Sequence, residues 1–236
     1  MKSEGQSFRG TDNLLLRFPP AAVTASLSEV ARYAGGSRYR PDEKMRKVIA
    51  ESLSLASRLI QPGAVYRLHR IGGLEEEGRG ILTGPLQAGL PVGVILSEKS
   101  LLGAVVITLG AALEEEVKAL NERREVVRAL YLDAAGSALL QGLDALMEAE
   151  LKREADKRGL NLACRQGPGL NLLPLELQRD LFRLVDPAPL GVALNEQMVI
   201  RPAKSVSFFI FFSDSPRRRE KYDCASCQRE DCLYRK

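Results

Sequence analysis

The segment from Ala111 to Gly159 restricts the fold of this chain more than any other part of the sequence. It runs for about fifty residues with almost no helix breaker, so it must be mostly helical, with one break near Asn121. The second part, from about Arg123 to Arg158, contains the small-residue run DAAGSA, where two backbones can approach closely. Gly159 provides a C-terminal stop. The sequence therefore predicts two consecutive helices, of which the second is long.

Further helices and strands are expected on both sides of this segment. Ser26 and Glu29 have capping-box spacing at the start of a short helix that ends at Gly35 and Gly36. A second helix follows Pro41, which is expected at the first helical position, and stops at Pro62-Gly63. Strands are expected over 64–71, 79–84, 101–110, 160–166, 187–194, 197–202 and 205–212, and a further helix over 174–186.

The order of these elements indicates the fold class. Helices and strands alternate without regular βαβ units, which is typical of an α+β domain with a largely antiparallel sheet. With 236 residues, of which 45% are hydrophobic, the chain is long enough to bury a substantial core. We expect an α+β fold with a twisted, largely antiparallel sheet flanked by long helices.

Composition argues against a membrane or nucleic-acid partner. No apolar run approaches the roughly 20 residues that cross a bilayer, and the start MKSEGQSFRG lacks the apolar region of a secretion signal. A cytoplasmic location is therefore expected. The net charge is only +4, Trp is absent and aromatic residues make up 6%, so no basic face with stacking aromatics is expected.

Generic catalytic motifs do not identify an enzyme. The lone His69 lies between Arg67 and Arg70 in an alternating strand, which favours a structural or surface role. No nucleotide-binding glycine loop and no nucleophile elbow is present. The stretch RQGPGL is more suggestive, because Arg165 offers a guanidinium for a carboxylate and Gly169 lets a backbone approach a ligand closely. The alternative is an ordinary Gly-Pro turn with a solvated arginine.

The chain ends in a basic segment that contains three of its four cysteines. Residues 217–236 hold seven Arg or Lys and four acidic residues. Cys224 and Cys227 form a C-x2-C pair, and Cys232 follows five residues later. Three cysteines at this spacing favour a [4Fe–4S] cluster, because such a cluster tolerates a fourth ligand from outside. Zinc is less favoured, because structural zinc sites usually have four protein ligands. The alternative is a tail with free thiols.

A family resemblance extends over nearly the whole body of the chain. The succession RYAG, TLG, LDAAGS, RQGPGL, LFRLVDPAPLGVALNE and RPAKSVSFFIFF resembles the activation domain of vitamin B12-dependent methionine synthase, in its stand-alone form. The similarity runs from about Glu29 to Phe212. Its most specific parts are the R-x-x-P-G element at 165–169 and the P-x-x-S-V-S element at 202–207.

The resemblance implies a helmet-like α+β fold that binds S-adenosylmethionine in a shallow groove beside a twisted antiparallel sheet. It implies docking over the cobalamin of a partner, either a cobalamin-binding protein or a truncated methionine synthase, for reductive methylation within methionine biosynthesis. An electron donor such as flavodoxin or ferredoxin is a further expected partner. By matching position, Arg165 would bind the ligand carboxylate, Gln166 and Gly169 would give backbone contacts, and Pro202, Ser205 and Ser207 would shape the wall near the corrin.

Two positions depart from the family pattern. The element at Arg165 usually continues with Tyr, and Leu170 stands there instead; a family carboxylate on the long helix falls at Gln141. The expected organisation is an activation domain-like part over 1–216 and a basic, cysteine-rich tail over 217–236. Two functions stay open: an accessory reactivation protein, and a non-catalytic corrinoid-protein-binding or assembly subunit that has lost S-adenosylmethionine. A third reading uses the tail only as a zinc-stabilised interaction module.

Overall fold

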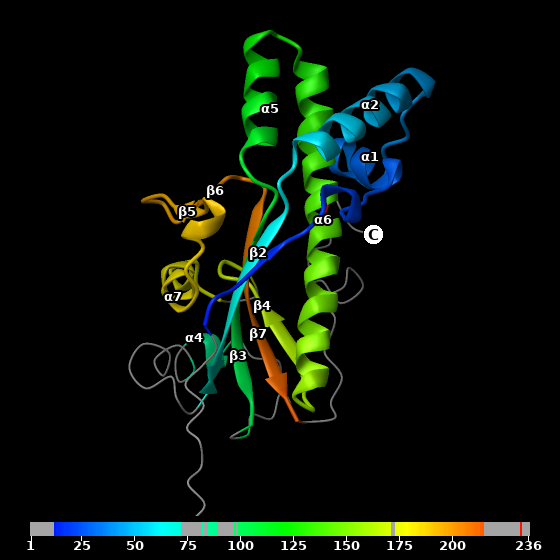
Figure 1. Ribbon diagram of the computed structural model, residues 1–236. Helices are drawn as coiled ribbons and strands as arrows, with labels where there is room; N and C mark the ends of the chain where they lie inside the picture. Colours follow the sequence, from blue (N-terminus) through cyan, green and yellow to red (C-terminus); the bar gives the residue numbers. More distant parts are fainter. Residues whose placement is uncertain are drawn as a thin grey trace, which may run out of the picture.

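A five-stranded sheet forms the centre of the molecule (Figure 1). The computed structural model describes residues 12–71, 82, 85–88, 97, 99–170, 173–214 and 232. The strand order is β1-β2-β3-β7-β4, and every neighbouring pair is antiparallel, so the expected α+β fold class is confirmed. The strands are β1 (Leu14–Arg17), β2 (Gly63–Arg70), β3 (Leu101–Thr108), β7 (Ser205–Ser213) and β4 (Asn161–Gln166).

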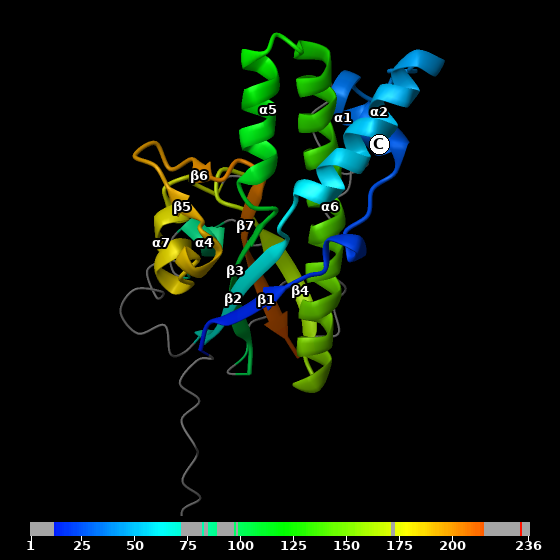
Figure 2. The same cartoon turned by 45° about the horizontal axis from the view of Figure 1, so that its top comes forward.

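Helices cover both faces of this sheet. Helices α1, α2 and α6 lie on one face, while α7 and the small β5–β6 hairpin lie on the other (Figures 1 and 2). The helices are α1 (Leu27–Gly35), α2 (Glu43–Leu59), α4 (Pro85–Ala88), α5 (Ala112–Glu122), α6 (Val126–Lys157) and α7 (Leu177–Leu184), and the hairpin strands are β5 (Ala193–Leu194) and β6 (Ile200–Arg201). Two 3-10 turns, η1 (Pro20–Ala22) and η3 (Ala188–Leu190), complete the described elements.

Strand β7 separates two hydrophobic cores. Its phenylalanines alternate between the faces, as side chains of a strand must. Phe208 and Phe212 join Leu139 and Leu143 of α6 in the larger core. The other core contains Phe209, Phe211, and Leu181 and Leu184 of α7. Because both faces of the central strands are covered, β3 is buried along its whole length, as its run of β-branched residues predicts.

The long breaker-free segment folds as predicted. It forms α5 and α6, which are joined by a turn at 123–125, close to the break expected near Asn121. Arg124 takes a positive φ of 61° in this turn, and Arg123 pairs with Glu116 at 2.8 Å and with Glu125 at 3.0 Å. Gly159 follows the end of α6 with a φ of 65°, which confirms its role as a stop.

The first two helices show one confirmed cap and one error. Ser26 and Glu29 form the predicted capping box of α1, in which Ser26 N–H donates to the Glu29 carboxylate at 2.8 Å. The sequence predicts Pro41 as the first residue of α2, but the structure places Pro41 before the helix. Asp42 is the N-cap instead, because its carboxylate accepts a hydrogen bond from Met45 N–H at 2.7 Å, and the helix begins at Glu43.

Several other boundaries differ from the predictions. The helix expected over 174–186 is shorter. The strand expected over 187–194 is present only at its end, as β5, whereas Ala188–Leu190 form the 3-10 turn η3, because Pro187 and Pro189 restrict the backbone. The strand β1 was not predicted. The strand predicted over 79–84 lies outside the described residues except for Leu82, which is buried and helical rather than extended. In the part of the chain that is described, no helix has the length and apolarity of a membrane span.

Candidate functional site

Four polar residues of α6 form a line along the helix. Asp133, Ser137, Gln141 and Asp144 are spaced four, four and three residues apart, which places them on one helical face. Each meets a polar side chain from a segment distant in sequence. We call these four residues the α6 polar stripe. It is the feature that brings the predicted binding residue Arg165 together with other elements.

Arg165 lies at one end of the stripe. Its position near the end of β4 points the guanidinium toward α6, where Nη1 donates to Asp144 Oδ2 at 2.7 Å. The guanidinium carbon also lies 3.6 Å from the centre of the Phe208 ring, in the geometry of a cation–π contact. The side chains of Arg165 and Asp144 are 22% and 29% exposed. The arginine is therefore held in place by two contacts and still reaches solvent.

One carboxylate oxygen of Asp144 has no hydrogen-bond partner among the described residues. This atom, Oδ1, is buried. Buried polar atoms are nearly always hydrogen bonded, so an orphaned carboxylate oxygen points to a donor that is supplied by a ligand or by water. Together, Arg165 and Asp144 present a cation and an anion side by side. That pair matches the carboxylate and ammonium groups of an α-amino acid.

Gln141 lies one turn before Asp144 on α6 and links the helix to α1. Its Oε1 accepts a hydrogen bond from Arg32 Nη2 at 3.1 Å and another from Tyr33 Oη at 3.3 Å. The Arg32 guanidinium also lies 4.4 Å from the centre of the Tyr33 ring. The amide oxygen at Gln141 is thus already committed within the fold. The acid within reach of Arg165 is Asp144.

The loop that contains Pro202 meets the other end of the stripe. Lys204 Nζ lies 2.8 Å from Asp133 Oδ1 and donates to Ser137 Oγ at 2.9 Å. Glu114 of α5 holds the same loop through Arg201 Nη1 and Ala203 N–H, both at 2.6 Å. Pro202 itself is buried and follows a cis peptide bond.

Ser205 and Ser207 lie on β7 and face away from the stripe. Ser205 Oγ donates to Thr108 Oγ1 at 2.8 Å on the neighbouring strand. Ser207 Oγ donates to Gln178 Oε1 of α7 at 3.0 Å and is buried. Both hydroxyls therefore belong to the α7 side of the sheet. The structure does not bring them to the same surface as Arg165.

The turn after β4 presents an apolar tip. Gly169 has a φ of 79°, and its N–H donates to the Leu173 carbonyl at 2.9 Å, which folds the turn back on itself. A side chain at Gly169 would be strained, since this left-handed backbone region favours glycine. Leu170 is 62% exposed and Leu175 is 42% exposed. Gln166, in contrast, is 5% exposed and lies within the fold.

Sequence reasoning missed Asp144, Arg32 and Phe208 as neighbours of the predicted site. Asp144 was open to detection, because it continues the three- and four-residue spacing of polar positions that runs through Ser137 and Gln141. Arg32 and Phe208 belong to the elements RYAG and RPAKSVSFFIFF, but nothing in the sequence places either side chain near the other site residues. Their proximity depends on how α1 and β7 pack against α6.

His69 and the cysteines provide less evidence of a functional site than Arg165 and Asp144. His69 Nε2 lies 3.0 Å from the Leu184 carbonyl, which links β2 to α7, and burial lowers the pKa of the imidazole. That placement supports a structural role. Cys232 is a half-buried free thiol, whereas Cys224 and Cys227 lie outside the described residues. Within the ranges that are described, no group of three or more His, Cys, Asp or Glu side chains is arranged to bind a metal ion.

Comparison with known proteins identifies a similar fold. No family model matches the sequence, and no curated protein matches it. Among solved structures, the chain is similar to the MetH reactivation domain bound to AdoHcy, with a TM-score of 0.57 and 11% sequence identity. The match covers 89% of this chain and 81% of that one. At this identity the likeness establishes a shared fold.

Proposed function

We propose that this protein is an accessory reactivation protein for a cobalamin-dependent methionine synthase or another corrinoid methyltransferase. It docks on the cobalamin of its partner and supports reductive methylation of that cobalamin with S-adenosylmethionine. The observation that carries the proposal is the fold shared with the MetH reactivation domain over 89% of the chain. The residues at the end of β4 agree with it, because Arg165 and Asp144 suit an amino-acid ligand.

The site residues fit S-adenosylmethionine through its amino-acid end. We assign the ligand carboxylate to Arg165 and the ligand ammonium to Asp144, whose Oδ1 lacks a partner within the described structure. When bound, S-adenosylmethionine would supply an electrophilic methyl group. The residues of this chain bind and orient it.

Calorimetry with S-adenosylmethionine and with AdoHcy tests this assignment. A charge-assisted contact of arginine with carboxylate is worth about 1.5–3 kcal/mol, so Arg165→Ala should weaken binding by roughly ten- to a hundredfold. Arg183→Ala is the matched control, because Arg183 is an exposed arginine on α7 that also pairs with an aspartate, Asp180. Equal affinities of wild type and Arg165→Ala would remove Arg165 from the site.

The second candidate is a non-catalytic corrinoid-protein-binding or assembly subunit that has lost S-adenosylmethionine. Leu170 favours it, because a hydrophobic side chain replaces the tyrosine of the family element, and so does Gln141, which is hydrogen bonded to Arg32 and Tyr33. Under this function the protein would change the visible spectrum of a cobalamin-loaded partner without binding S-adenosylmethionine. A spectral titration beside the calorimetry separates the two.

The exposed tip at Leu170 gives a separate test of docking. Leu170 is 62% exposed, so Leu170→Ser should change stability by no more than about 0.5 kcal/mol. Burial of this side chain against a partner would contribute about 1–2 kcal/mol, which predicts a roughly five- to thirtyfold loss of partner affinity. The affinity for S-adenosylmethionine should stay within twofold. An unchanged partner affinity would place the docking surface elsewhere.

We further propose that Cys224, Cys227 and Cys232 bind a [4Fe–4S] cluster, in a cysteine-rich tail over 217–236 that follows the activation domain-like part over 1–216. The sequence spacing supports this, and zinc is the alternative. Anaerobic purification should give a brown protein, and Cys227→Ser should bleach it. A colourless protein with stoichiometric zinc would instead indicate the zinc-stabilised interaction module.

A further inference from the structure

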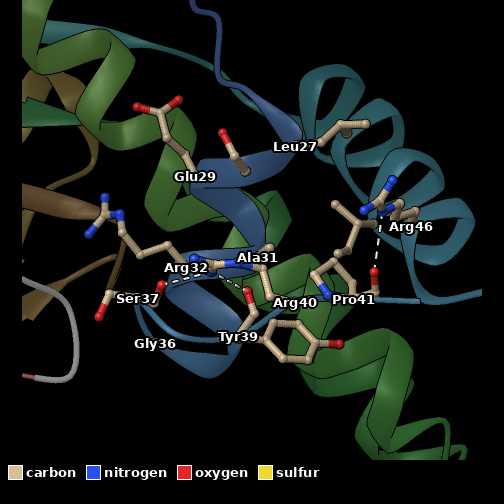
Figure 3. A pocket seen from close by; sticks show the side chains of 12 residues that line it. Leu27, Glu29, Ala31, Arg32, Gly36, Ser37, Tyr39, Arg40, Pro41 and Arg46 are labelled. Carbon is tan, nitrogen blue, oxygen red and sulfur yellow. Dashed lines mark hydrogen bonds between the residues drawn. The ribbon is translucent and has the colours of Figure 1, made fainter. Parts of the chain in front are cut away.

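A pocket lies between α1 and α2, and it shares neither Arg165 nor Asp144 with the site proposed above (Figure 3). Its volume is about 620 Å³, within the range of roughly 300–1,000 Å³ that small-molecule sites occupy. It is built from one face of α1, the loop over 36–42 and the first turns of α2. The pocket is therefore large enough for a small ligand.

The lining of the pocket is largely apolar. Leu27 and Ala31 are one helical turn apart on α1, and Ile49 faces them from α2. Leu27 is 45% exposed, which is high for a leucine on the side of a helix that packs against a neighbour. Tyr39 and Pro41 add apolar surface from the loop. Ala31 and Ile49 are nearly buried, so an apolar ligand body would mainly remove the surface of Leu27 and of the loop from water.

Two arginines at the pocket are held by backbone carbonyls (Figure 3). Arg40 Nη1 donates to the Ser37 carbonyl at 2.9 Å and to the Tyr39 carbonyl at 3.0 Å. Arg46 Nε donates to the Pro41 carbonyl at 3.2 Å. These bonds use only part of each guanidinium, which has five N–H donors. The remaining donors are positioned in advance, so that a bound anion would order little additional side chain.

The acidic residues nearby are committed to other partners. Glu29 closes the capping box of α1, Asp42 caps α2 and Glu43 pairs with Lys47. Within the described part of the chain, neither Arg40 nor Arg46 takes part in an ion pair. The pocket thus combines an apolar floor with two arginines that form no ion pair within the described residues. Glu29 and Arg32 also line it, one charge of each sign, so Arg40 and Arg46 give the lining a net positive charge.

We infer that this pocket is a second binding site, for a small amphiphile with an anionic head group, either carboxylate or phosphate. The apolar body lies against Leu27, Ala31 and Ile49, and the head group accepts hydrogen bonds from Arg40 and Arg46. The inference is independent of the proposed function, because neither Arg165 nor Asp144 lines this pocket.

NMR titration of the full chain with octanoate tests the inference. The amide signals of Ala31, Gly36, Ser37 and Ile49 should shift together as octanoate binds. Octanamide, which has nearly the same shape but no charge, should bind at least tenfold more weakly. This comparison uses the unmutated chain, so it does not depend on how a variant folds. Octyl phosphate in a parallel titration identifies the preferred head group, and tighter binding of either anion supports the site.

Variants then assign the head group to its arginines. Arg40→Gln and Arg46→Gln should each weaken octanoate binding about tenfold, and the double variant more. Arg38→Gln is the matched control: Arg38 is exposed in the same loop and does not line the pocket. An equal effect of Arg38→Gln would mean that only the general positive charge of the loop attracts the anion, and would overturn the inference. Equal binding of octanoate and octanamide, or absence of shifts at these amides, would overturn it as well.

Discussion

Replacing Asp144 by asparagine separates the two tasks that the structure gives this carboxylate. Its Oδ2 holds Arg165 at 2.7 Å, and its Oδ1 is buried without a partner among the described residues. Asparagine keeps the shape of the side chain and one acceptor oxygen, but removes the charge. The substitution should therefore lower both the stability of the fold and the affinity for a ligand with an ammonium group.

The cost in stability follows from the exposure of the pair. An exposed ion pair is worth about 0–1 kcal/mol, and removal of one partner of a fully buried pair costs about 3–5 kcal/mol. Arg165 and Asp144 are 22% and 29% exposed, which places them between these limits. The Phe208 ring still supports the guanidinium in the variant. We expect a loss of about 1–2 kcal/mol in the free energy of unfolding.

The substitution should also lower the affinity for the ligand, because the contact between the ligand ammonium and the Asp144 carboxylate is charge-assisted. Its loss is worth about 1.5–3 kcal/mol, so the affinity of Asp144→Asn for S-adenosylmethionine should fall by roughly ten- to a hundredfold. Loss of the ion pair also frees Arg165 for the ligand carboxylate, which offsets part of this fall. The net expectation is a decrease of at least about fivefold.

Denaturant unfolding and calorimetry on the same samples measure both quantities. Asp133→Asn is the control, since Asp133 belongs to the same α6 polar stripe and pairs with Lys204, but is 54% exposed and lies at the other end. Because the Lys204 side chain is only 12% exposed, Asp133→Asn should also lower stability by about 1–2 kcal/mol, but it should leave the ligand affinity unchanged. An affinity of Asp144→Asn equal to or higher than wild type would refute the assignment of the ammonium to Asp144.

Other predictions concern stability. Burial raises the pKa of both Tyr66 and Tyr131 to about 12, so the folded state holds their protons longer than the unfolded chain. Stability should therefore fall as pH rises from 10 toward 12, by up to about 1.4 kcal/mol per pH unit for each tyrosine. Tyr66→Phe should remove its share of this fall in denaturant unfolding at about pH 10–12. Burial lowers the pKa of His69, so the unfolded state takes up its proton first and stability should fall as pH drops below about 6.5. His69→Gln should reduce the dependence of the unfolding free energy on pH between 7 and 5.5. An unchanged dependence would show that carboxylates cause the loss of stability. Gly142→Ala should destabilise the chain by about 1–3 kcal/mol despite better helix propensity, because the new Cβ would clash with the Thr24 carbonyl; a gain in thermal stability would contradict this packing.

Local signals in the sequence predict the elements of this fold better than their pairing. The breaker-free segment, the capping box at Ser26 and the alternating strands each act within a few residues, so α6, α1 and β3 follow from sequence. Strand β1 does not, because Leu14–Arg17 is a four-residue edge strand between a polar start and Pro19-Pro20. Its pairing with β2 depends on contacts about fifty residues away.

The candidate site was predictable only in part, for the same reason. Arg165 stands out in sequence because it precedes a Gly-Pro-Gly turn. The groups that orient it come from elsewhere: Asp144 lies 21 residues earlier on α6, and Phe208 lies on β7. Position matching selects Gln141 as the counterpart of the family carboxylate, whereas the acid in contact with the arginine is one turn further along the helix.

This displacement bears on the choice between the two proposed functions. Gln141 stands where the family has a carboxylate. This difference argues against S-adenosylmethionine binding only if no other acidic side chain lies at the site. Asp144 already pairs with Arg165 and has an oxygen to spare, so the fold retains the charges that an amino-acid ligand needs. The substitution at Leu170 affects a different surface, since that side chain points into solvent at the tip of the turn. As proposed here, ligand binding depends on Arg165 and Asp144, whereas Leu170 belongs to the proposed docking tip. The replacement of the family tyrosine by Leu170 therefore does not by itself remove the charged groups that the ligand assignment needs.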